Sequence, residues 1–166
     1  MQVRPGPMLE VMERSHGIRP LGDPFARFRR EHRGVLTRLD ALERVARLER
    51  PTPASERLVR ETVDHLERQF ATHMAAEDAV LFPAVADSFP ESRETLVPLT
   101  IEHETLRSML AALRETLARP RGRTRHEQLV VQTRDLVDLL RIHIHKEEIV
   151  VFALAERVLR PRGVRD

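Results

Sequence analysis

At residues 73–82 the chain reads His73-Met74-Ala75-Ala76-Glu77-Asp78-Ala79-Val80-Leu81-Phe82, and 70 residues later it reads His143-Ile144-His145-Lys146-Glu147-Glu148-Ile149-Val150-Val151-Phe152. Both stretches follow the pattern His-x-x-x-Glu-acid-x-Val-aliphatic-Phe. In an α-helix, residues four apart lie one turn apart on the same face. The His and Glu of each copy can therefore reach one metal centre.

A second repeat has nearly the same period. Glu31-His32-Arg33 recurs 71 residues later as Glu102-His103-Glu104. The chain thus consists of two halves, each with one His followed 40 or 41 residues later by a His-x-x-x-Glu motif. These repeats predict six metal-ligating residues: His32, His73, Glu77, His103, His143 and Glu147.

The composition limits the possible classes of protein. A length of 166 residues fits one domain with a substantial core, and the absence of cysteine excludes disulfides and thiolate metal sites. The chain has no apolar run of membrane-spanning length and no signal-peptide core, so we expect a cytoplasmic protein without a membrane partner. The formal net charge is only +2, and arginines alternate with acidic residues, so we expect no nucleic-acid partner. No protein partner can be identified.

The spacing of apolar residues predicts four helices. Asp23-Pro24 is a start signal for the first, which should end before Pro51, and Ser55 is expected to begin the second. Pro83 is expected to kink or end the second helix. Pro98 leaves open where the third helix begins: it can be a first-turn residue of the main helix, with residues 91–97 forming a separate turn. The last residues of the apolar stripes are predicted to be Val80 and Ala84 on the second helix and Val150, Leu154 and Val158 on the fourth.

Short connections between these helices predict an all-α fold, an antiparallel up-down-up-down four-helix bundle with a metal site in its core. The bundle should span residues 23–159, with an N-terminal arm at 1–22 and a C-terminal tail at 160–166. Each of the four predicted ligand histidines fills a gap in an apolar stripe. His65 lies off the stripe and is expected at the surface. At a rise of about 1.5 Å per residue, the four stripe histidines fall within a few Å of one height.

Burial of six ionisable groups is costly unless they are paired or bound to a metal. A hydrogen-bonded polar layer in the core is the alternative to a metal site. Imidazole and carboxylate ligands without thiolate suit iron, manganese or zinc. Six ligands are too many for one tetrahedral zinc, and two carboxylates can bridge two ions that each take two histidines. The residue count therefore favours a dinuclear iron site.

The six positions in this order, with Leu81-Phe82-Pro83 after the first Glu, resemble the hemerythrin-like (HHE cation-binding) family. The resemblance implies two iron ions in an oxo- or hydroxo-bridged di-iron centre. His32 and His73 would bind one iron, and His103 and His143 the other. Glu77 and Glu147 would bridge the two. Asp78 and Glu148 would either orient the ligands or be exposed acids.

The chain departs from the oxygen-carrying hemerythrins at one position. Those proteins have a further His four residues after the one at His103, where this chain has Arg107. We expect Arg107 to turn outward and pair with Glu104. The ligand set resembles that of bacterial iron-centre repair proteins and iron-sensing domains, but the repair proteins also have a cysteine-containing segment.

Two classes of function are compatible with these residues. The preferred one is a protein that binds iron and a small ligand, O₂ or NO, in sensing, storage or stress response. The alternative is a di-iron oxidoreductase acting on peroxide or nitric oxide, or in iron-centre repair. The sequence identifies no catalytic residue and no substrate pocket to support an enzyme. A structural bundle that binds zinc is a third interpretation.

Overall fold

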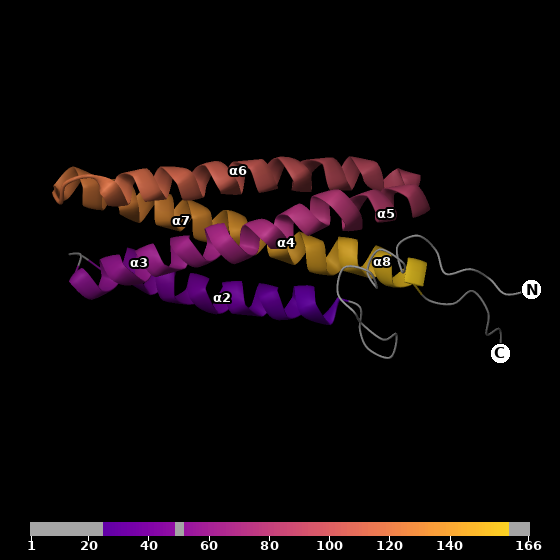
Figure 1. The fold of residues 1–166 in the computed structure, drawn as a ribbon, viewed down its shortest axis with the longest axis horizontal. Helices are drawn as coiled ribbons and strands as arrows, with labels where there is room; N and C mark the ends of the chain where they lie inside the picture. Colours follow the sequence, from indigo (N-terminus) through magenta and orange to yellow (C-terminus); the bar gives the residue numbers. More distant parts are fainter. Residues whose placement is uncertain (1–24, 49–51, 160–166) are drawn as a thin grey trace, which may run out of the picture.

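The computed structural model describes residues 25–48 and 52–159, and within these residues the secondary structure is helical, with no strand. Four long helical rods lie side by side (Figure 1). The predicted arm and tail and the start signal at Asp23-Pro24 lie outside the described residues. The first helix ends at Ala46, which confirms the predicted end before Pro51.

The first rod is α2 (Ala26–Ala46), and the third is α6 (Arg93–Ala118), preceded by the short 3₁₀ turn η3 (Pro90–Ser92). The second rod consists of α3 (Pro53–His65), η1 (Leu66–Phe70), α4 (Ala71–Ala76), η2 (Glu77–Leu81) and α5 (Phe82–Ser88). The fourth consists of α7 (Arg123–Lys146), η4 (Glu147–Val151) and α8 (Phe152–Leu159). Segments η1, η2 and η4 are π-helical turns within continuous rods.

The second rod begins two residues before the predicted Ser55. Pro53 occupies the first helical turn, where its missing N–H costs no hydrogen bond. Thr52 caps the helix by accepting a 3.0 Å hydrogen bond from the Ser55 backbone N–H, and the Ser55 hydroxyl accepts one of 2.8 Å from the Thr52 N–H. Ser55 is therefore the third residue of a capping box and does not begin the helix.

Two prolines lie inside rods. The second rod continues past Pro83 to Ser88, and the return from π to α geometry comes just before this proline. The third rod begins at Arg93, so residues 93–97 belong to the main helix and Pro98 lies inside it. Pro90 begins the 3₁₀ turn that precedes this helix.

The π turns η2 and η4 displace the core-facing side of their rods by one residue. In η2 the Phe82 N–H bonds to the carbonyl of Glu77, five residues back, where an α-helix would use the residue four back. The predicted stripe residues Val80 and Ala84 are consequently only half-buried. The residues that reach the core instead are Leu81, Phe82 and Val85.

The fourth rod repeats this displacement, because η4 begins at Glu147 and the Phe152 N–H bonds to its carbonyl. Val150 and Leu154 are half-buried where full burial was predicted. The core residues here are Val151, Phe152 and Ala155. Both glutamates of the repeated motif thus begin a π turn, which keeps them and the following apolar residues on the same side of the rod.

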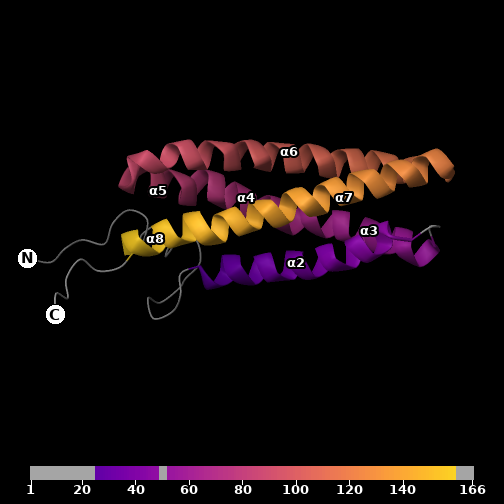
Figure 2. The ribbon, with the colours of Figure 1, turned by 180° about the vertical axis from the view of Figure 1, so that it is seen from behind.

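The rods form a ring of neighbours. Helix α7 packs against α2 and α6, and α3 packs against the same two helices from the other side (Figures 1 and 2). The apolar core between them consists of two separate clusters, a larger one that includes Leu39, Leu66, Leu113 and Leu136 and a smaller one that includes Phe25, Val85, Leu99 and Ala155. A polar layer lies between the two clusters along every rod.

A buried ion pair stabilises the end of the bundle away from the smaller cluster. Arg125 on α7 donates to Glu56 on α3 at 2.9 Å. Its guanidinium also donates to the backbone carbonyls of Thr116 and Leu117, at the C-terminal end of α6. Arg125 therefore joins three rods and supplies donors to carbonyls that have no helical partner.

In the described part of the chain, none of the helices is both long and apolar enough to cross a membrane.

Candidate metal centre

The polar layer contains all six residues of the repeated motifs. His32 comes from α2, His73 from α4, His103 from α6 and His143 from α7, while Glu77 and Glu147 are the first residues of η2 and η4. None of the six is more than 3% exposed. The structure therefore brings together six ionisable side chains from four rods in the buried interior of the bundle.

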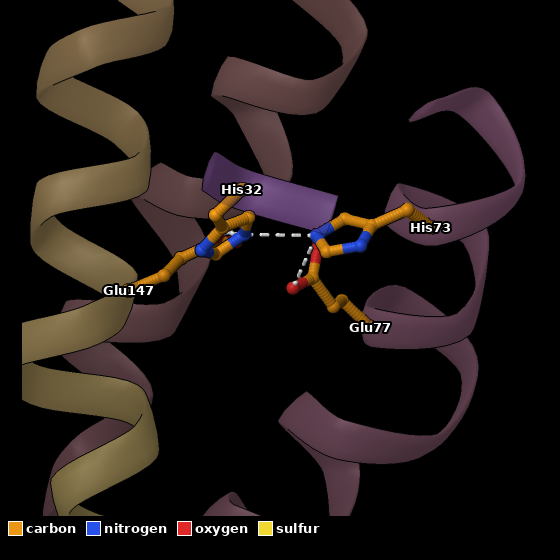
Figure 3. Close-up of side chains that lie close together, drawn as sticks. All are labelled: His32, His73, Glu77 and Glu147. Carbon is orange, nitrogen blue, oxygen red and sulfur yellow. Dashed lines mark hydrogen bonds and ion pairs between the residues drawn. The ribbon is translucent and has the colours of Figure 1, made fainter. Parts of the chain in front are cut away.

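The ligand atoms of these residues face one another. The Nε2 atoms of His32 and His73 are 2.9 Å apart, and those of His103 and His143 are also 2.9 Å apart. Figure 3 shows the first pair, with both rings pointing toward each other and Glu77 beside His73. In each pair, the two rings thus direct their nitrogens at the same point.

Both glutamates extend across the two histidine pairs. Glu77 places one oxygen 3.0 Å from His73 Nε2 and the other 3.6 Å from His103 Nε2. Glu147 places one oxygen 3.3 Å from His32 Nε2 and the other 3.1 Å from His143 Nε2. Two groups of four ligand atoms result, each within 4.8 Å: His32, His73, Glu77 and Glu147, and Glu77, His103, His143 and Glu147.

The other nitrogen of each ring contacts a carboxylate outside this layer. Nδ1 lies 2.7–3.2 Å from a carboxylate oxygen in all four cases: His32 with Glu148, His73 with Glu31, His103 with Asp78, and His143 with Glu102. A carboxylate acceptor holds the proton on Nδ1, so the Nε2 lone pair points into the layer. These four outer carboxylates therefore set the tautomer that a metal ligand requires.

The sequence indicated only two of the four outer carboxylates. Asp78 and Glu148 were candidates for this role, and their contacts with His103 and His32 decide against the alternative of merely exposed acids. Glu31 and Glu102 were missed, although each directly precedes a stripe histidine in the repeated Glu-His pair. The repetition of this Glu-His pair was the sequence signal that could have identified both glutamates.

Cations lie outside three of the four outer carboxylates. Arg27 bonds to Glu31 at 2.7 Å, and Lys146 bonds to Glu102. Arg107 bonds to Asp78 at 3.1 Å, so the predicted pairing of Arg107 with Glu104 is wrong. Asp78 projects from the neighbouring rod close to both His103 and Arg107, a contact between rods that spacing along one helix cannot show.

Aromatic rings close the layer above and below. Phe152 stacks on His32 with centroids 5.4 Å apart, and Phe82 stacks on His103 at 5.5 Å. Phe70 stacks on His73 at 4.8 Å. Stacked rings limit the rotation of the imidazoles and keep water away from their Nε2 atoms.

The pKa values of several buried ionisable groups are shifted. Burial opposes a charged His73, but its contacts with Glu31 and Glu77 outweigh this and raise its pKa to about 9. The pKa of His143 is raised in the same way by Glu147 and Glu102. Burial and the charge of Glu147 raise the pKa of Glu77, whereas three surrounding imidazoles lower that of Glu147 despite its burial. Without a metal, the negative charge of the carboxylates in and around the layer can be balanced by the four histidines only if these are protonated.

The residues present fit a pair of metal cations. All four carboxylate oxygens of Glu77 and Glu147 are buried without a hydrogen bond, although imidazole nitrogens lie close by. With Nδ1 protonated, two Nε2 lone pairs also face each other at 2.9 Å in each pair. A cation in each group of four ligands would satisfy the oxygens and the lone pairs together.

The remaining described histidines lie outside the centre. His145 is exposed, as its two-residue offset from His143 predicts. His126 is half-buried near the start of α7. His65 is half-buried as well, so its predicted surface position is only partly right. Burial and the nearby Arg38 and Arg68 lower its pKa.

The chain matches a protein-family model. The family model of the hemerythrin HHE cation binding domain matches residues 23–155, which is most of the chain. Neither the curated proteins nor the solved structures gave a match to this chain.

Proposed function

Because the chain belongs to the hemerythrin HHE cation-binding domain family, we propose that it is a di-iron protein that binds a small ligand, O₂ or NO, in sensing, storage or stress response. The proposal takes the bundle to be antiparallel, up-down-up-down, with the metal centre in its core. A pair of iron ions would supply reversible redox chemistry and open coordination positions for such a ligand.

One observation carries the proposal. Four Nε2 atoms, each fixed by an outer carboxylate, converge on two glutamates whose oxygens have no hydrogen bond. His32 and His73 would hold one ion, and His103 and His143 the other. Glu77 and Glu147 would contact both, because each directs one oxygen to each histidine pair.

The ligand chemistry favours iron over zinc. A closed structural zinc site takes four ligands in tetrahedral geometry, whereas six ligands shared between two ions leave coordination positions free on both. The surrounding Phe rings and apolar clusters exclude water, which protects a reduced ion and its bound ligand from uncontrolled oxidation.

Metal analysis of protein purified from an iron-replete host tests the proposal. We expect two iron ions per chain and near-ultraviolet charge-transfer absorption. The chain contains no Trp and no Tyr, so these bands should be almost free of protein absorbance. Exposure of the reduced protein to O₂ and to NO should give distinct visible spectra. One ion per chain, or zinc without such bands, would contradict the proposal.

A further inference from the structure

A cleft of about 280 Å³ opens between α2 and the second rod, on the outer side of His73. Its walls combine an apolar floor with a polar rim: Arg30, Glu31, Gly34, Val35, His65, Gln69, Phe70 and His73. Val35 and Phe70 are almost fully buried and belong to the larger apolar cluster. A molecule in this cleft would therefore lie on an apolar surface with charged groups around its edge.

Gly34 forms part of the cleft wall. It is an exposed residue in the middle of α2, where a Cβ atom would meet nothing within 4 Å. Gly costs about 1 kcal/mol relative to Ala inside a helix, so its use here trades stability for space. At the equivalent position of the second half, 71 residues later, the chain has Thr105.

Other residues of the cleft also differ between the halves. Arg30 corresponds to Ile101, and Gln69 corresponds to Leu139, which packs against the larger apolar cluster. Arg30 and Gln69 thus give the first half polar rim residues that the second half lacks, although the metal-ligating residues are repeated. The symmetric metal centre does not account for this difference.

The rim of the cleft is cationic. Arg30 makes no ion pair with any of the described residues, and Arg38 and Arg68 lie close enough to His65 to lower its pKa. The acids nearby are engaged elsewhere. Asp64 and Glu67 bond to Arg114, and Glu31 bonds to Arg27 and His73.

We propose that this cleft binds a small organic carboxylate with an apolar body. The carboxylate would pair with Arg30 at the rim, and the body would lie across Gly34 on Val35 and Phe70. Arginine is suited to this task because its planar guanidinium binds a carboxylate with two parallel hydrogen bonds. The volume is near the lower limit for small-molecule pockets, which selects a ligand of benzoate size.

Calorimetric titration of the purified protein with benzoate tests this site, with benzyl alcohol as the uncharged probe. Gly34→Leu should abolish binding of both compounds, because the new side chain fills the cleft. It should also leave the protein at least as stable to heat, since Leu favours helix over Gly. Arg30→Gln should weaken benzoate binding at least tenfold and leave benzyl alcohol binding unchanged.

The internal repeat supplies a matched control. Thr105→Leu places the same side chain at the equivalent position of the second half and should leave benzoate binding unchanged. Binding that survives Gly34→Leu would overturn the proposal, including the case in which benzoate binds directly to the metal ions. No heat of binding with the parent protein at millimolar benzoate would overturn it as well. Neither result depends on how many iron ions the protein holds, so this site and the proposed di-iron function can fail separately.

Discussion

Removal of the Glu31 carboxylate should weaken one of the two metal positions and spare the other. Glu31 accepts the Nδ1 proton of His73 at 2.7 Å, and a water molecule entering from the cleft would be only an uncharged, weaker acceptor in its place. In Glu31→Ala the ring can then shift its proton to Nε2, which removes the lone pair directed at the metal.

The size of the effect follows from the role of such outer carboxylates. Their loss typically weakens metal binding about 10–100-fold, or about 1.4–2.7 kcal/mol. Glu31→Ala should reach the upper part of this range. Glu31→Gln should stay near the lower end, because the amide oxygen still accepts the proton but carries no charge.

A chelator competition assay that follows iron loss would measure this directly. The parent should release its two ions with similar affinity, whereas Glu31→Ala should release one at much lower chelator concentration. Glu102→Ala should mirror this at the second histidine pair, and Glu104→Ala, on an exposed side of α6, should match the parent. If Glu31→Ala releases both ions as the parent does, the carboxylate does not position His73 for a metal.

Three further outcomes are expected. Glu77→Ala should lose the paired centre and retain at most one weakly held ion by metal analysis, whereas Glu67→Ala, on the same rod but paired with the exposed Arg114, should keep both; equal metal content in the two variants would refute the bridging role. Arg125→Ala should cost roughly 3 kcal/mol in urea unfolding, because it leaves the Glu56 carboxylate buried without its main partner, and a loss below about 1 kcal/mol would mean that the pair is dispensable. In metal-free protein the His73 pKa is raised from 6.5 to about 9, so its stabilisation is complete below pH 6.5 and is lost as the pH rises to 9. Iron-loaded protein should lack this decline, and identical urea midpoints across this pH range in metal-free protein would contradict it.

The internal repeat made much of the centre predictable. A His-x-x-x-Glu motif places two side chains on one helical face whatever the surroundings, and a gap in an apolar stripe marks where that face enters the core. The number of residues between each histidine and the nearest connection then predicted that His32 and His103 lie at the same level along the bundle axis. The buried apolar residues of α6, from Leu96 to Leu117, likewise follow the helical period, with His103 filling the gap between Leu99 and Leu106.

Contacts between rods and departures from α geometry could not be predicted in this way. The π turns at Glu77 and Glu147 displaced the core residues by one, because a single wider turn leaves no trace in a pattern read with a period of 3.6 residues. The partner of Arg107 was mistaken because Asp78 comes from another rod. Pro98 was expected at most in the first turn of the third helix, but residues 93–97 precede it in the same helix, which local preference disfavours and tertiary packing decides.

The two halves of the centre are interleaved. Asp78 and Phe82 of the first half hold His103 of the second, while Glu148 and Phe152 of the second hold His32 of the first. Neither half alone has a complete environment for its own histidines. Two identical half-length chains related by a twofold axis would, however, supply every one of these contacts reciprocally. The arrangement is what duplication and fusion of the gene for a dimeric ancestor would leave behind.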